Sequence, residues 1–256
     1  MSDTTADDII DRRRLRRKLT FWRVIAFCVV LIGLFTIALA SLPEERFGTK
    51  SRPHIAKIRI EGTILEDEKL LGVLEDVGKS EAVKGVILTI DSPGGTTAGG
   101  EAIYEAVREL AEVKPVAAQI GTVGASAAYM IAAATDHIVA RKTSIVGSIG
   151  VLFQFGNIAK LMETLGVHME AVKSAPLKAE PDFYSPTSPE ARAMLKTLVM
   201  DSYDWFVGIV ADRRDMDPTE ARRVADGRIY SGGQALKLDL VDAIGGEDVA
   251  RDWLAA

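Results

Sequence analysis

The feature that most constrains the fold is a series of short β-branched runs separated by helical stretches. A run such as 83-VKGVILTI-90 is typical of a strand buried on both faces of a parallel sheet. The stretch 98–113 has apolar residues at helical spacing, with Ile103 and Val107 on one face. This alternation predicts an α/β domain whose mostly parallel sheet is covered by helices. The predicted strands are residues 54–61, 83–90, 115–120, 137–141, 151–155 and 168–173.

Length and charge limit the choice further. The 256 residues, of which 48% are hydrophobic, suffice for one α/β domain with a sizeable core but hardly for two. The formal net charge of −5 argues against a general nucleic-acid binder, which would present a basic face. A long helix is predicted to begin at Ser188, because Ser-Pro-Glu supplies an N-cap and a proline at the first helical position. The proline-rich stretch 174–189 predicts a long loop, which in a compact domain is usually functional.

The N-terminal part has the pattern of a membrane anchor. The basic run 12-RRRLRRK-18 precedes an uncharged apolar run over 24–40, which is about long enough to cross a bilayer. Arginines before the run predict a cytoplasmic N-terminus and an exported remainder. The predicted organisation is a basic cytoplasmic segment over 1–20, a transmembrane anchor over 21–41, a linker over 42–53 and a folded domain over 54–256.

A cleaved secretory signal is the alternative for the same run. Ala38-Leu39-Ala40 before Ser41 resembles an A-x-A cleavage site. The apolar run is longer than the usual core of a signal peptide, about 7–15 residues, and this length favours an uncleaved anchor. The single cysteine, Cys28, lies in the run, so the exported domain is expected to have neither a disulfide nor a thiol nucleophile.

Two glycine-containing loops directly follow predicted strands. They are 91-DSPGG-95 and 121-GTVGAS-126, and in open parallel sheets functional sites form at the carboxyl ends of strands. Ser126 has two interpretations here: a nucleophile at a strand-to-helix turn, or an N-cap of a helix over 126–134 with small neighbours for close packing. Local sequence alone favours the cap. As a nucleophile, Ser126 would have the backbone N–H groups of Gly95 and Ala127 as oxyanion donors.

A reactive serine needs a general base, and the histidines are poorly placed to supply one. His54, His137 and His168 are far apart in the sequence, and they lack the paired spacing of a zinc site. We therefore expect no metal and no cofactor. The alternative base is a lysine whose pKa is lowered by burial. The candidates after the serine are Lys142, Lys160, Lys173, Lys178, Lys196 and Lys237.

Five motifs in a fixed order together resemble the signal peptide peptidase A family of serine-lysine proteases, in its short, single-repeat bacterial form. They are 91-DSPGG-95, 124-GASAAYM-130, 147-GSIGV-151, 172-VKSAPLK-178 and 227-GRIYSGGQALKLDLVDAIGG-246. The resemblance covers roughly residues 54–250. It implies a Clp protease/crotonase-like fold, a ββα superhelix, with serine endopeptidase activity and no cofactor.

The resemblance also implies roles for particular residues. The family's nucleophile falls on Ser126, its lysine base on Lys178, and a serine that orients the lysine on Ser148. The oxyanion donors fall on Gly95 and Ala127. The family commonly has glycines after the nucleophile, where this chain has alanines, and this difference implies a narrower pocket for the substrate side chain.

Partners and location follow from the same resemblance. Short members form ring-shaped homo-oligomers in which the serine and lysine of one site come from adjacent protomers. The implied substrates are remnant signal peptides and similar apolar peptides, cleaved beside the bacterial inner membrane on its periplasmic side. Two alternatives remain: a crotonase-fold acyl-CoA enzyme, and a non-catalytic membrane assembly that binds peptides.

Overall fold

The computed structural model describes residues 21–34 and 52–256. Residues up to Arg52 form a unit separate from Pro53–Ala256, and each unit is treated by itself. Residues 21–34 are helical. Within the described ranges, no helix combines the length and apolar character needed to span a membrane. The predicted anchor continues through residues 35–41, which lie outside the described residues.

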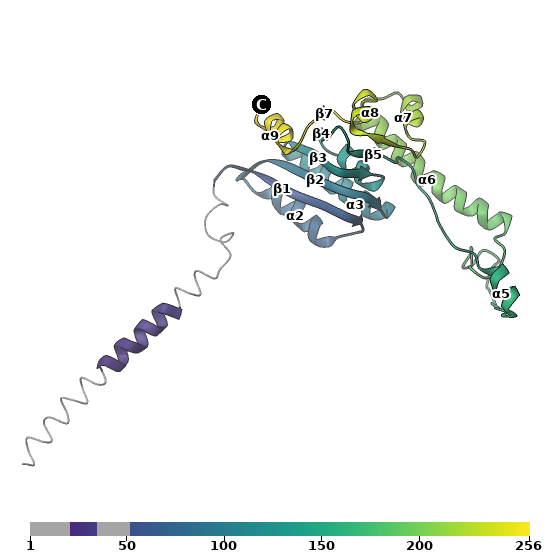
Figure 1. Cartoon of the computed structure of the whole chain (residues 1–256), viewed down its shortest axis with the longest axis horizontal. Helices are drawn as coiled ribbons and strands as arrows, with labels where there is room; N and C mark the ends of the chain where they lie inside the picture. Colours follow the sequence, from purple (N-terminus) through teal and green to yellow (C-terminus); the bar gives the residue numbers. More distant parts are fainter. Residues whose placement is uncertain (1–20, 35–51) are drawn as a thin grey trace, which may run out of the picture. The chain divides into compact units, whose positions relative to one another are not determined.

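The larger unit is built on a mostly parallel β-sheet (Figure 1). Its strands are β1 (His54–Ile64), β2 (Val83–Gly95), β3 (Val116–Ala125), β4 (His137–Ala140), β5 (Ile145–Gly147), β6 (Ile229–Ser231) and β7 (Ala243–Ile244). Strands β1, β2, β3, β4 and β7 are parallel neighbours in that order. Strand β5 continues the sheet beside the end of β3, and β6 pairs with β5 in the antiparallel sense.

Helices cover both faces of this sheet. They are α2 (Glu68–Lys79), α3 (Thr97–Val113), α4 (Ala127–Ala133), α5 (Ala159–Leu165), α6 (Pro189–Arg213), α7 (Pro218–Val224), α8 (Gly232–Lys237) and α9 (Glu247–Ala255). The main core lies between the sheet and helices α2, α3, α4 and α6, while α9 packs on the other face with Ala250 fully buried. Because β2 and β3 are covered on both faces, their side chains are apolar in continuous runs rather than in alternation.

Four of the six predicted strands are confirmed as β1 to β4, and the predicted helix over 98–113 is confirmed as α3. The helix predicted from Ser188 is α6, where the Ser188 hydroxyl accepts a hydrogen bond from Ala191 N–H at 3.0 Å. The strands predicted over 151–155 and 168–173 are wrong, because neither segment is in a sheet. Their apolar residues are instead exposed: Leu152 is 76% exposed, and Val172 is fully so.

Residues 151–200, here called the arm, extend away from the sheet (Figure 1). The arm consists of the chain after β5, α5, the loop over 166–188 and the first half of α6. The segment before α5 is hydrogen-bonded to the loop before α6, because Ile158 N–H donates to Phe183 O at 2.8 Å. Only the second half of α6 enters the main core, through Phe206, Val207 and Val210.

Candidate active site

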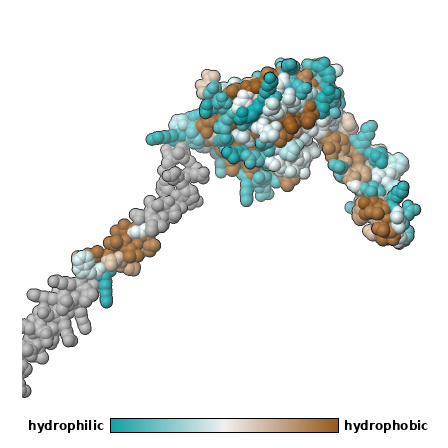
Figure 2. Space-filling view, viewed as in Figure 1, coloured by the Kyte–Doolittle hydropathy of each residue, from teal (hydrophilic) through white to brown (hydrophobic). Residues whose placement is uncertain are grey.

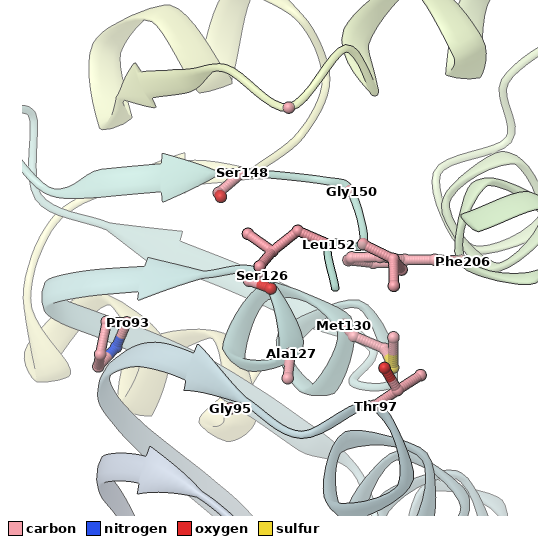
Figure 3. A pocket seen from close by; sticks show the side chains of 12 residues that line it. Pro93, Gly95, Thr97, Ser126, Ala127, Met130, Ser148, Gly150, Leu152 and Phe206 are labelled. Carbon is pink, nitrogen blue, oxygen red and sulfur yellow. The ribbon is translucent and has the colours of Figure 1, made fainter. Parts of the chain in front are cut away.

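A pocket of about 530 Å³ opens at the carboxyl ends of β2 and β3 (Figure 3). Its lining residues are Pro93, Gly95, Thr97, Ser126, Ala127, Met130, Ser148, Gly150, Val151, Leu152, Phe206 and Gly227. Four of the five residues predicted for the site therefore meet here: Ser126, Ala127, Gly95 and Ser148. They come from three loops that are far apart in the sequence and adjacent in the sheet.

Ser126 occupies a strained turn between β3 and α4. Its φ of 57° and ψ of −125° are unusual for a residue with a side chain. The Ser126 N–H donates to Gly147 O at 2.8 Å, and this bond holds the turn against the end of β5. Ser126 stands at the N-cap position of α4, as the second interpretation expects, but its side chain makes no capping hydrogen bond to the helix. Such strain, of order 1–3 kcal/mol, is typical of functional turns, and it leaves the hydroxyl facing the pocket.

The loop after β2 is in direct contact with this turn. Gly94 has a φ of 107°, and a Cβ added to it would lie 2.7 Å from Ser126 Cβ and 3.2 Å from Ala127 N. Gly94 N–H donates to the hydroxyl of Ser92, which is fully buried, at 3.1 Å. Only glycine allows this close approach, so Gly94 brings the 91–95 loop to the serine.

The two residues predicted as oxyanion donors, Gly95 and Ala127, both line this pocket. Ala127 is the first residue of α4, where an N–H has no acceptor within the helix. Gly95, the residue after Gly94, lines the same pocket. Ser148, after β5, has a φ of 51°, and its N–H donates to Arg228 O at 2.8 Å, which keeps the side chain at the pocket (Figure 3).

The predicted base is the one site residue that the structure does not bring to this pocket. Among the described residues, no titratable side chain lines it. Lys178 is exposed on the arm, in the loop before α6. Pro189, where α6 begins, is about 25 Å along the helix axis from Phe206, which reaches the pocket. The structure therefore does not bring Lys178 to the pocket of its own chain.

The histidines are also remote from Ser126. His137 pairs with Ala117 near the amino end of β3, about 30 Å from Ser126 by the rise of a strand. It stacks on Trp253 at 4.9 Å, and burial lowers its pKa although Asp242 opposes the shift. His54 is the first residue of β1, so it also lies at the amino ends of the parallel strands.

Sequence reasoning missed the apolar part of the pocket. Met130 comes from α4, Phe206 from α6 and Leu152 from the start of the arm. Met130 stands within the quoted motif 124–130, so it could have been proposed from its position one helical turn after Ser126. Phe206 carries no local signal, because its contribution depends on how α6 crosses the sheet.

The mostly parallel α/β sheet is consistent with a Clp protease-like fold, because residues 68–146 match the Clp protease family. Residues 108–256, more than half of the chain, match Peptidase family S49. The chain therefore belongs to peptidase family S49, and it is a serine protease.

Individual relatives agree with this assignment. A putative protease of Synechocystis sp. is 37% identical over 211 residues, which cover 82% of this chain and 76% of that protein. A putative signal peptide peptidase of Enterococcus faecium is 38% identical over 197 residues, covering 73% of this chain and 55% of that protein. A chloroplastic serine protease of Arabidopsis thaliana is 33% identical over 188 residues, which cover 72% of this chain and 28% of that protein.

The close approach at Gly94 leads to a first prediction. Gly94→Ala would press a methyl group against Ser126 Cβ and place alanine at a φ of 107°, so peptide hydrolysis should fall at least about tenfold. The free energy of unfolding should fall by about 1–3 kcal/mol. The control is Gly72→Ala in α2, where an added Cβ meets nothing within 4 Å. Equal activity of the two variants in a peptidase assay would contradict the role of Gly94.

Proposed function

We propose that this serine protease is a membrane-anchored endopeptidase that uses a dyad of Ser126 and Lys178 to cleave remnant signal peptides and similar apolar peptides. One observation carries the proposal. A strained serine faces a pocket that, among the described residues, has no titratable side chain, while an exposed lysine stands on the arm. Serine is a weak nucleophile without a base, so the lysine must come from outside the pocket.

The mechanism is acyl transfer in two steps. The neutral amine of Lys178 takes the hydroxyl proton of Ser126 as its Oγ attacks the peptide carbonyl carbon. The N–H groups of Gly95 and Ala127 stabilise the oxyanion, and the Lys178 ammonium protonates the leaving amine. Lys178 then takes a proton from a water molecule as it attacks the acyl carbon, the ester bond to Ser126 Oγ breaks, and the Lys178 ammonium returns the proton to that oxygen. Ser148 is proposed to orient the lysine through its hydroxyl.

A ring-shaped homo-oligomer would bring the two halves of the dyad together. Large apolar side chains are exposed along the arm (Figure 2), and gathered exposed apolar residues often mark an interaction surface. The exposed apolar residues of the arm include Leu152, Phe153, Ile158, Leu161, Leu165, Val167, Met169, Val172, Leu177, Phe183 and Leu198. We propose that a neighbouring protomer covers this surface, and that its own pocket then receives Lys178.

The substrate and the location are proposed from two further features. Met130, Leu152 and Phe206 make the pocket apolar, and Ala127 beside the serine favours small side chains at the cleaved bond. The apolar run over 24–40 after a basic segment supports an anchor in the bacterial inner membrane, with the catalytic domain periplasmic. The finer fold, a ββα superhelix, is supported by the match to Clp protease.

A fluorophosphonate probe tests the proposal directly, because it reacts covalently only with an activated serine. In the assembled full-length protein, we expect one adduct per chain, mapped to Ser126 by mass spectrometry of its peptides. The same protein carrying Lys178→Ala should remain unlabelled at Ser126. Labelling of a different serine would contradict the assignment, and peptide binding without any labelling would favour the non-catalytic alternative.

A further inference from the structure

The loop of the arm contains two lysines with different surroundings. Lys173 Nζ donates to Glu180 Oε1 at 2.8 Å and to Asp182 Oδ2 at 3.4 Å. Lys178 is exposed, and within the described part of the chain its side chain has no hydrogen-bond or ion-pair partner. Because Lys178 lies between Lys173 and Glu180 in the sequence, their ion pair closes at its base the loop that contains Lys178.

The two carboxylates in this contact are well buried, although most of the arm is exposed. The side chain of Glu180 is 12% exposed and that of Asp182 only 8%. Asp182 Oδ1 also accepts hydrogen bonds from Tyr184 N–H, from Ser185 N–H and from the Ser185 hydroxyl. Opening the loop would leave these charges without partners, which is costly, so the network holds one loop conformation.

Backbone bonds complete the loop around Lys178. Its N–H donates to Ala175 O at 3.0 Å, and Glu180 N–H donates to Leu177 O at 3.3 Å. Ala179, the next residue, has a φ of 64°, in the left-handed region. These turns, which end at the partly buried ion pair, therefore fix the backbone conformation at Lys178.

We infer that Lys173 is a positioning residue: its ion pair with Glu180 holds the loop that presents Lys178 as the base. The inference rests on the proposed serine-lysine dyad and adds a role that the dyad does not include. Lys173 itself is unsuited to be the base, because its hydrogen bond to Glu180 raises its pKa although burial opposes the shift. At neutral pH it is an ammonium, which has no lone pair to accept a proton.

Lysine-to-arginine and lysine-to-methionine variants of the full-length protein separate the two roles. Lys173→Met should lower kcat about 10–100-fold with KM changed less than about threefold, because a base misplaced by about 1 Å costs roughly 100-fold. Lys173→Arg should keep kcat within about threefold, since a guanidinium can bind both carboxylates but cannot act as a neutral base. Lys178→Arg should be inactive. Lys160→Met in α5, an exposed lysine of the same arm, is the matched control.

The outcomes distinguish this inference from the proposed function. Wild-type kcat in Lys173→Met, with Lys178→Arg inactive, would overturn the positioning role and leave the dyad standing. An inactive Lys173→Arg with an active Lys178→Arg would make Lys173 the base and overturn both. If Lys173→Met does not fold, Asp182→Asn is the second variant, because it keeps Oδ1 as an acceptor. Its kcat should fall about 3–10-fold with the melting temperature and assembly size retained, and an unchanged kcat would overturn the inference.

Discussion

Replacing Ser126 with alanine is expected to reduce kcat for peptide hydrolysis by at least about 10⁴-fold. Without the hydroxyl no acyl-enzyme forms, and only oxyanion stabilisation and binding remain, as in other serine proteases that have lost their nucleophile. KM should change little, because the apolar lining from Met130, Leu152 and Phe206 is intact. A peptidase assay on a fluorogenic peptide with a small residue at the cleaved bond, measured at matched protein concentration, gives both values.

The fold should survive this replacement, since alanine keeps the Cβ at the same φ of 57°. Ser126→Gly should also be inactive yet more stable by about 1 kcal/mol, because glycine adopts this backbone conformation without strain. The matched control is Ser80→Ala at the end of α2, away from the pocket, which should keep wild-type kcat. Residual hydrolysis by Ser126→Ala above about 1% of wild type would overturn Ser126 as the nucleophile.

The second large effect is expected at Lys178. Lys178→Ala should be as inactive as Ser126→Ala, since an unassisted serine hydroxyl is a poor nucleophile at neutral pH. If the lysine of one protomer serves the serine of the next, coexpression of the two variants should restore activity. With random mixing at equal amounts, a site has both intact residues about a quarter of the time, as expected for a head-to-tail ring contact.

The recovered fraction is the measurement that decides between two arrangements. A recovery near a quarter of wild-type kcat supports a site shared between protomers. No recovery in a mixed assembly of confirmed composition would mean that Ser126 and Lys178 of one chain work together, and the arm would then have to fold back over its own pocket. Full activity of Lys178→Ala alone would contradict the dyad itself.

The sheet could be predicted because its signals are local, whereas the roles of the site residues came from the resemblance carried by five motifs spread along the chain. The β-branched runs of β1 to β4 and the apolar face of α3 reflect burial on both faces of a parallel sheet. The loops after β2 and β3 end at the same edge of that sheet, so Gly95 and Ser126 were expected to be close. The strand predicted over residues 151–155 was wrong, because a short apolar run has the same pattern whether it is buried within its own chain or exposed on its surface.

The sequence by itself determined the alternation of strands and helices, the order of the motifs and the presence of one serine at a strand-to-helix turn. These follow from side-chain type and spacing, which act over a few residues. Only the tertiary structure decided that Ser126 has a strained backbone and makes no side-chain capping bond, that Gly94 makes room for it, and that Lys178 does not reach the pocket of its own chain. Each depends on contacts between segments that are distant in sequence, where close packing and the path of α6 set the geometry.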